Sequence, residues 1–171
     1  MQEPQKKLIW GICGSIACFK AVPTIRELIK KGFKIDVILT DFATRFITPE
    51  LISPLINGKV YTDFYHNGEW VNYVELASEA HAIVIAPATL NTISKLACGI
   101  ADNLLLTTVY SSNCPVFIFP AMEENMWLNP VTTKNKEELT GRGFFLFDVE
   151  YGELASGKKG HGRLYDCLLY T

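Results

Sequence analysis

The segment Pro120-Ala121-Met122-Glu123-Glu124-Asn125-Met126-Trp127 directly follows an apolar run at residues 114–119. Two upstream segments, GICGSIA at residues 11–17 and APATLNT at residues 86–92, follow apolar runs in the same way. Short continuous apolar runs that end in turn-forming residues are typical of parallel strands buried on both faces. We therefore expect all three segments to be loops at the carboxyl ends of parallel strands, where open α/β sheets bind their ligands.

Strand and helix patterns alternate along the rest of the chain. Apolar runs predict strands at residues 7–12, 33–39, 81–86, 114–119 and 144–147. Helical spacing predicts helices at residues 16–31, 92–99, 104–110 and 131–140, with shorter helical pieces at residues 41–46 and 49–57. Pro23 is compatible with the first helix only if it lies in an early turn. The alternation predicts an α/β fold in one domain of residues 1–171, with a parallel sheet between two helical layers and a loop-like, glycine-rich end.

Composition excludes several classes of protein. The chain has 171 residues, 49% of them hydrophobic, and a net charge of −2, so it can bury a sizeable core and offers no basic patch to nucleic acid. No apolar run reaches the roughly 18 residues of a membrane span, and the polar start is unlike a secretory signal. The five cysteines form no CxxC pair. We expect reduced, buried thiols, a cytoplasmic location and no metal site.

Small and hydroxyl residues stand at the predicted carboxyl edge of the sheet. Gly11-x-x-Gly14-Ser15 lies between a strand and a helix, where main-chain N–H groups favour an anion such as a phosphate. The alternative is a tight turn with Ser15 as a helix cap. The same two interpretations, ligand contact or capping, apply to Thr40, Thr89 and Thr92. Their shared location favours a ligand more than any one of them does.

Four segments, taken together and in order, resemble a known family. They are Gly14-Ser15-Ile16-Ala17, Thr40 with Phe46-Ile47-Thr48-Pro49, Pro87-Ala88-Thr89-Leu90-Asn91-Thr92, and Pro120-Ala121-Met122 with Met126-Trp127. The chain is similar to the homo-oligomeric flavin-containing cysteine decarboxylases, whose motifs are PASANT and PxMNxxMW and whose members act in coenzyme A biosynthesis and on peptide cysteines. The similarity runs from about residue 7 to residue 163.

The resemblance implies a Rossmann-like, flavodoxin-type parallel sheet, bound FMN, and a homo-oligomer (a trimer or dodecamer) with the cofactor near a subunit interface. It also implies a C-terminal flap at about residues 150–171 and a small-molecule or peptide thiol as substrate. The FMN contacts that it implies are Gly14, Ser15, Ile16, Thr40, Phe46, Ala88, Thr89, Asn91, Thr92 and Met122.

Three positions that match catalytic residues of the family carry other side chains here. The family histidine corresponds to Tyr73, and a phenol, with a reference pKa of about 10 against about 6.5 for imidazole, is expected to donate a hydrogen bond rather than act as a base. The family asparagine corresponds to Glu123, and the redox cysteine of the flap to Ser156, which cannot reduce an intermediate. His66 and His81 are out of register, and we expect a structural role for His81.

The carboxylate of Glu123 would repel a substrate carboxylate. The sequence leaves three possibilities: Glu123 is protonated, the substrate has a different group at this position (a cationic group is one option), or Glu123 faces solvent. Two functional hypotheses follow. The chain is either a flavin-dependent carboxy-lyase acting on a thiol, or an FMN-binding protein without cysteine decarboxylase activity, serving as a regulatory or partner subunit or catalysing a different flavin reaction.

Overall fold

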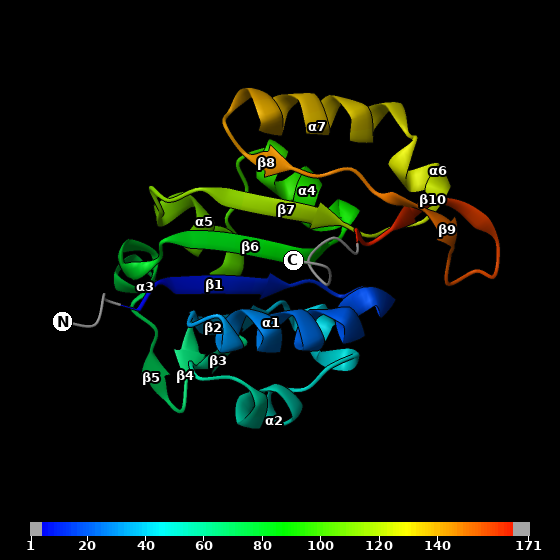
Figure 1. Ribbon diagram of the computed structural model, residues 1–171. Helices are drawn as coiled ribbons and strands as arrows, with labels where there is room; N and C mark the ends of the chain where they lie inside the picture. Colours follow the sequence, from blue (N-terminus) through cyan, green and yellow to red (C-terminus); the bar gives the residue numbers. More distant parts are fainter. Residues whose placement is uncertain (1–4, 166–171) are drawn as a thin grey trace.

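A six-stranded parallel sheet forms the centre of the computed structural model, which describes residues 5–165 (Figure 1). Its strands, in chain order, are β1 (Lys7–Ile12), β2 (Lys34–Leu39), β3 (Val60–Tyr61), β6 (Ala82–Ala88), β7 (Val116–Pro120) and β8 (Phe145–Leu146). They lie side by side in the order β3-β2-β1-β6-β7-β8, and every neighbouring pair is parallel. Counted within the sheet, this is the doubly wound order 3-2-1-4-5-6. The predicted Rossmann-like α/β fold is confirmed.

Helices cover both faces of the sheet, and each face has its own buried cluster. One cluster, which includes Trp10 and Ile12 of β1, packs against α1 (Ala21–Lys30) and α2 (Pro49–Ile52). The other cluster includes Ile9 of β1 and packs against four further helices. These are α3 (Tyr73–Glu79), α4 (Leu90–Ala97), α5 (Leu104–Ser111) and α7 (Pro130–Gly141). Successive β1 side chains therefore enter opposite cores, which explains the unbroken apolar runs of the sequence.

The helix predicted for residues 16–31 is in fact two pieces. A short 3-10 helix (Ile16–Lys20) leads into α1, and Pro23 lies in the first turn of α1, where a missing N–H costs nothing. The two shorter helical pieces are found where they were predicted: a 3-10 turn occupies Asp41–Arg45, and α2 is followed by a second 3-10 turn at Ser53–Leu55.

Two antiparallel hairpins are absent from the sequence prediction. β4 (Tyr65–His66) and β5 (Glu69–Trp70) flank Asn67 and Gly68, which both have positive φ, as a two-residue Asn-Gly turn requires. The glycine-rich end, predicted to be loop, contains β9 (Glu150–Glu153) paired with β10 (Lys159–Arg163). The alternating apolar pattern of a strand is missing there, because this hairpin packs through its glycines.

The predicted C-terminal flap overlaps this β9–β10 hairpin, and its residues after 165 lie outside the described part of the chain. No helix among residues 5–165 has the length and apolar character needed to cross a bilayer. Within the same range, no three or more His, Cys, Asp or Glu side chains are grouped as a metal site.

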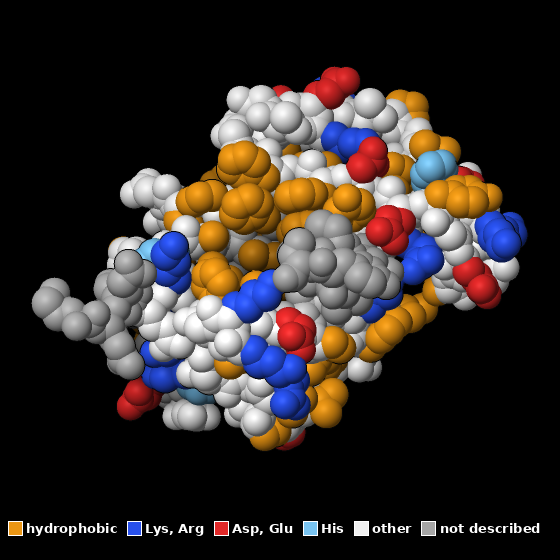
Figure 2. All heavy atoms as spheres, in the orientation of Figure 1, with side chains coloured by type: hydrophobic (Ala, Val, Ile, Leu, Met, Phe, Trp, Pro, Cys, Tyr) orange, Lys and Arg blue, Asp and Glu red, His pale blue; other side chains and the backbone are white. Residues whose placement is uncertain are grey.

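Aromatic side chains cover the β7–β8 side of the sheet. Figure 2 shows hydrophobic side chains gathered over these strands. The rings of Phe117 and Phe145 stack at 5.0 Å, those of Phe119 and Phe147 stack at 4.2 Å, and Phe145 is 52% exposed. This edge of the sheet is therefore apolar and only partly covered by the described residues.

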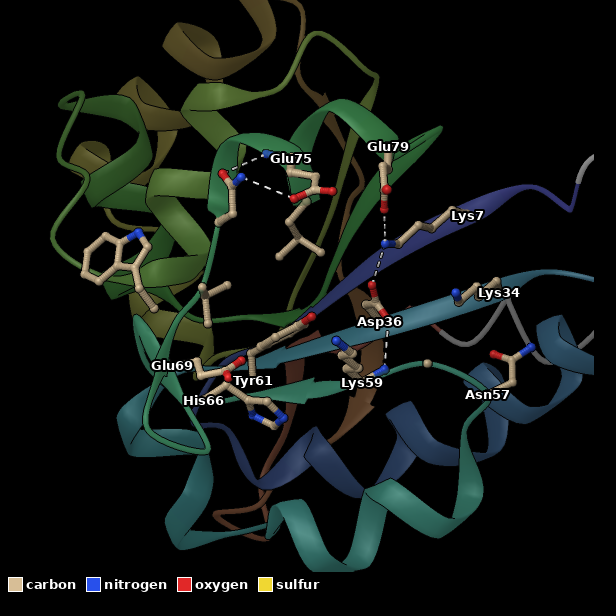
Figure 3. Close-up of a pocket in the computed structure, with 15 residues that line it drawn as sticks. Lys7, Lys34, Asp36, Asn57, Lys59, Tyr61, His66, Glu69, Glu75 and Glu79 are labelled. Carbon is tan, nitrogen blue, oxygen red and sulfur yellow. Dashed lines mark hydrogen bonds and ion pairs between the residues drawn. The ribbon is translucent and has the colours of Figure 1, made fainter.

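The amino edge of the sheet is held by a partly buried ion-pair network, which lines a cavity of about 560 Å³ (Figure 3). Lys7 Nζ lies 2.8 Å from Asp36 Oδ2 and 2.7 Å from Glu79 Oε2. Asp36, only 3% exposed, also accepts the main-chain N–H of Lys59 at 2.8 Å. Burial alone would lower the pKa of Lys7, but its hydrogen bonds to Asp36 and Glu79 outweigh this and raise it. These groups satisfy one another, so the network has a structural role.

We expect Asp36→Ala to lower the free energy of unfolding by about 3–5 kcal/mol, because it removes the buried partner of a cation. Glu79→Ala is the matched control: the Glu79 side chain is 51% exposed, and the expected loss is at most about 1 kcal/mol. Urea-induced unfolding measures both.

The contribution of the Lys7 ion pairs to the free energy of unfolding should be complete below a pH of about 10.4, the reference pKa of lysine. It should be lost as the pH rises through the higher pKa that Lys7 has in the folded protein. The difference between wild type and Asp36→Ala should therefore shrink at strongly alkaline pH. An equal decrease in the free energy of unfolding for Asp36→Ala and Glu79→Ala at neutral pH would contradict this explanation.

Candidate functional site

The loops after β1 and β6 meet at the point where the chain order of the sheet reverses. β1 is hydrogen-bonded to β2 on one side and to β6 on the other, so the chain leaves β1 toward β2 and leaves β6 in the opposite direction, toward β7. The main-chain N–H of Cys13 donates to the carbonyl of Pro87 at 3.1 Å, and Ala121 N–H donates to the carbonyl of Ala88 at 3.0 Å. Three loops that are distant in sequence are thereby joined at one edge, as predicted.

Gly14 allows the loop after β1 to approach the loop after β2. A Cβ on Gly14 would lie 2.5 Å from Phe42 Cδ1 and 2.9 Å from the Phe42 main-chain carbonyl carbon. Among residues 5–165, the main-chain N–H groups of Gly14 and Ile16 donate to no protein acceptor. Two donors next to a glycine at a strand–helix junction suit a phosphate group.

Ser15 and Thr89 cap helices, one of the two roles that the sequence left open. Ser15 Oγ accepts the N–H of Ala17 at 3.3 Å, and Thr89 Oγ1 accepts the N–H of Thr92 at 3.4 Å. Thr40 precedes a 3-10 turn, but its side chain makes no capping bond. The hydroxyl of Thr40 therefore makes no capping hydrogen bond at the edge where the loops converge.

The other residues implied as FMN contacts differ in exposure. Ala88 and Thr92 are buried, Met122 is half-buried, and Asn91, Ile16 and Phe46 are exposed. The Phe46 ring packs edge-on against that of Phe42, with ring centroids 5.5 Å apart.

Cys13 is a buried thiol behind this edge. Thr92 Oγ1 donates to Cys13 Sγ at 3.1 Å, and burial raises the pKa of Cys13 to about 11. Cys18 is also buried, and its burial raises its pKa. Both therefore remain neutral thiols near pH 7 and act as packing groups. Of the remaining cysteines, Cys114 is half-buried, but Cys98 is exposed, which corrects the expectation that it is buried; Cys167 lies outside the described residues.

A cavity of about 670 Å³ opens between the carboxyl edge and the β9–β10 hairpin. Ser15, Ile16 and Met122 line it on the sheet side. Leu154, Ala155 and Gly162 are among the hairpin residues that line it. The volume is within the range of small-molecule and cofactor sites.

The hairpin docks on the segment that follows β7. The N–H of Met122 donates to the carbonyl of Gly162 at 3.0 Å. A Cβ on Gly162 would lie only 2.0 Å from the carbonyl oxygen of Met122. Glu124, the first residue of α6 (Glu124–Trp127), accepts the N–H of His161 at 2.8 Å through Oε1. Glu124 was not among the site residues predicted from the sequence, where its only signal is the pair of glutamates at 123 and 124.

Glu123 and Ser156 are brought together by this docking. Ser156 Oγ donates to Glu123 Oε2 at 3.2 Å, and Glu123 lines the cavity. Glu123 is half-buried, and its hydrogen bond with Ser156 lies in an exposed position. One carboxylate oxygen of Glu123 is therefore engaged by the hairpin.

Within one chain, Tyr73 is not brought together with Glu123 and Ser156. It begins α3, and its ring packs edge-on against Phe64 and Trp70, with ring centroids 6.2 Å and 6.4 Å away. Figure 1 shows α3 beside the amino-terminal ends of β1 and β6, whereas Glu123 follows the carboxyl end of β7. His81, as expected, has a structural contact: its Nδ1 accepts the N–H of Lys7 at 3.2 Å.

Two curated relatives are similar to this chain. It is 37% identical over 165 residues to the coenzyme A biosynthesis bifunctional protein CoaBC of Borreliella burgdorferi, which covers 95% of this chain and 42% of the relative. It is 44% identical over 120 residues to a cysteine/cysteine sulfinic acid decarboxylase from an unknown prokaryotic organism, covering 69% of this chain and 33% of the relative. The chain thus spans less than half the length of these relatives.

Two solved structures share the fold. A phosphopantothenoylcysteine (PPC) decarboxylase mutant in complex with pantothenoylaminoethenethiol superposes with a TM-score of 0.84 at 27% identity, covering 98% of this chain and 94% of the other. The FMN-dependent cysteine decarboxylase TvaF of thioviridamide biosynthesis superposes with a TM-score of 0.80 at 32% identity, covering 84% and 90%. The flavoprotein family model matches residues 1–167. The chain therefore belongs to the flavoprotein family, among the flavin-dependent cysteine decarboxylases and their relatives.

Proposed function

We propose that this protein binds FMN at the carboxyl edge of its sheet, beneath the β9–β10 hairpin. The observation that carries the proposal is the meeting of the β1 and β6 loops at the reversal point of the sheet, beside a cavity of about 670 Å³. Gly14, Ser15 and Ile16 would hold the phosphate, and Met122 would contact the ring system. Thr40, Phe46, Ala88, Thr89, Asn91 and Thr92 complete the proposed contact set.

The proposed reaction class is flavin chemistry on a thiol. Bound flavin supplies the two-electron oxidation of a thiol that makes an adjacent carboxylate easy to lose. The relatives are named for cysteine and for a pantothenoyl thiol, which supports a small-molecule or peptide thiol as substrate. Within the protein, the cavity walls would orient that thiol, and the hairpin would keep water from it.

A second candidate is an FMN-binding protein without cysteine decarboxylase activity. The Glu123–Ser156 pair favours it, because a carboxylate and a hydroxyl stand together where carboxylate binding and thiol redox chemistry would need an amide and a cysteine. In that case the protein is a regulatory or partner subunit, or it catalyses a different flavin reaction.

We further propose that the protein acts in the cytoplasm as a homo-oligomer, a trimer or a dodecamer. Ile16, Phe19, Phe46 and Leu51 are large apolar residues, each roughly half exposed or more, and they line a groove of about 360 Å³ beside the site. Large apolar groups gathered in this way are typical of protein interfaces. A neighbouring copy would also bring a second Tyr73, which one chain does not supply to its own cavity.

Purified protein should be yellow and should bind FMN, as measured by titration of flavin fluorescence. Gly14→Ala should weaken FMN binding at least tenfold, because the new Cβ would collide with Phe42. Gly141→Ala is the matched control, since nothing lies within 4 Å of its Cβ position. Colourless protein that takes up no FMN, or equal FMN affinity in the two variants, would count against the site.

The wild-type protein should release no carbon dioxide from PPC above background, because Tyr73, Glu123 and Ser156 lack the required base, amide and thiol. The combined variant Tyr73→His, Glu123→Asn, Ser156→Cys should gain measurable release. Wild-type turnover of about 1 per second or faster, a typical enzymatic rate, would show this reasoning to be wrong.

Leu51→Glu should shift the protein from an oligomer toward the monomer in analytical ultracentrifugation, because it places a charge in the apolar groove. Val131→Glu is the control, since Val131 is 63% exposed on α7 and does not line the groove. A monomeric wild type, or equal behaviour of the two variants, would contradict the proposed interface.

A further inference from the structure

The cavity beneath the hairpin has charges of both signs on its walls. Glu123 and Glu153 contribute carboxylates, and Lys20 and Arg163 contribute cations. Much of the remaining wall is apolar or small. A cavity lined by both signs fits a ligand that itself carries both signs, because each ligand charge then meets an opposite charge when it leaves water.

Glu123 is the acidic group whose position is best defined. Ser156 Oγ donates to its Oε2, which fixes the carboxylate against the hairpin. Its Oε1 accepts no hydrogen bond from any residue between 5 and 165. Although Glu123 stands at the start of α6, its side chain makes no capping bond. One carboxylate oxygen at the cavity wall is therefore available to a donor on a ligand.

We propose that this cavity takes a small thiol amino acid with a free α-ammonium group, and that Glu123 accepts a hydrogen bond from that ammonium. This inference rests on the proposed FMN site, because it concerns the thiol that the flavin would oxidise. An ammonium offers three donors and a positive charge, whereas the nitrogen of an N-acylated thiol is a neutral amide. Charge-assisted hydrogen bonds are about twice as strong as neutral ones. Glu123 thus discriminates against N-acylated and peptide-linked thiols.

The test compares L-cysteine with N-acetyl-L-cysteine on the FMN-loaded protein under anaerobic conditions. Calorimetric titration and perturbation of the flavin absorption band both report binding without requiring turnover. L-Cysteine should bind at least tenfold more tightly, which is the scale of one charge-assisted hydrogen bond. Glu123→Gln should abolish this preference, because it removes the charge but keeps an oxygen that can accept the Ser156 hydroxyl.

Glu137→Gln, a charge-neutralising change on the exposed side of α7, is the control and should preserve the preference. Equal binding of the two ligands, tighter binding of N-acetyl-L-cysteine, or binding of neither by protein that holds FMN would overturn the inference and leave the proposed FMN site intact. Loss of the preference in Glu153→Gln but not in Glu123→Gln would also overturn it. Protein that takes up no FMN would overturn the proposed function, and the inference with it.

Discussion

The adjacency of β1 and β6 is the constraint on which the rest of the site depends. Once these two parallel strands are paired, the chain must leave β1 toward β2 and leave β6 toward β7, so a crevice opens between their loops. The bond from Cys13 N–H to the Pro87 carbonyl and the contact between Thr92 and Cys13 then fix the two loops against each other. The buried thiol of Cys13 is thus structural, although it stands directly behind the site.

The β9–β10 hairpin turns this crevice into a cavity. It is held by two neighbouring groups after β7: the N–H of Met122 and the carboxylate of Glu124. Glycine is needed at position 162 because a Cβ there would lie 2.0 Å from the Met122 carbonyl oxygen, and a Cβ at position 160 would displace the Glu124 carboxylate that holds the hairpin. The glycines that made this region look like loop are therefore the reason it can pack as a hairpin, and they place Ser156 against Glu123.

The sequence predicted five strands of the sheet and the three edge loops because buried parallel strands leave a strong local signal, as at residues 82–88; it missed the two-residue edge strand β3. It missed the β9–β10 hairpin, whose contacts are with distant main-chain atoms and whose residues lack an apolar pattern. It also missed the β4–β5 hairpin despite its Asn67-Gly68 turn, because strands of two residues are too short to show alternation. Motif similarity grouped Tyr73 with Glu123 and Ser156, but helix packing, which motifs do not encode, places Tyr73 among Phe64 and Trp70.

The central claim is that FMN lies between the carboxyl edge of the sheet and the β9–β10 hairpin. A crystal structure of the protein grown with FMN tests it most directly. The phosphate should lie at the amides of Gly14 and Ile16 and the ring system against Met122, within the cavity that Leu154 helps to line. Flavin bound in the cavity beside Lys7 and Asp36 at the amino edge, or at any other place on the surface, would contradict it.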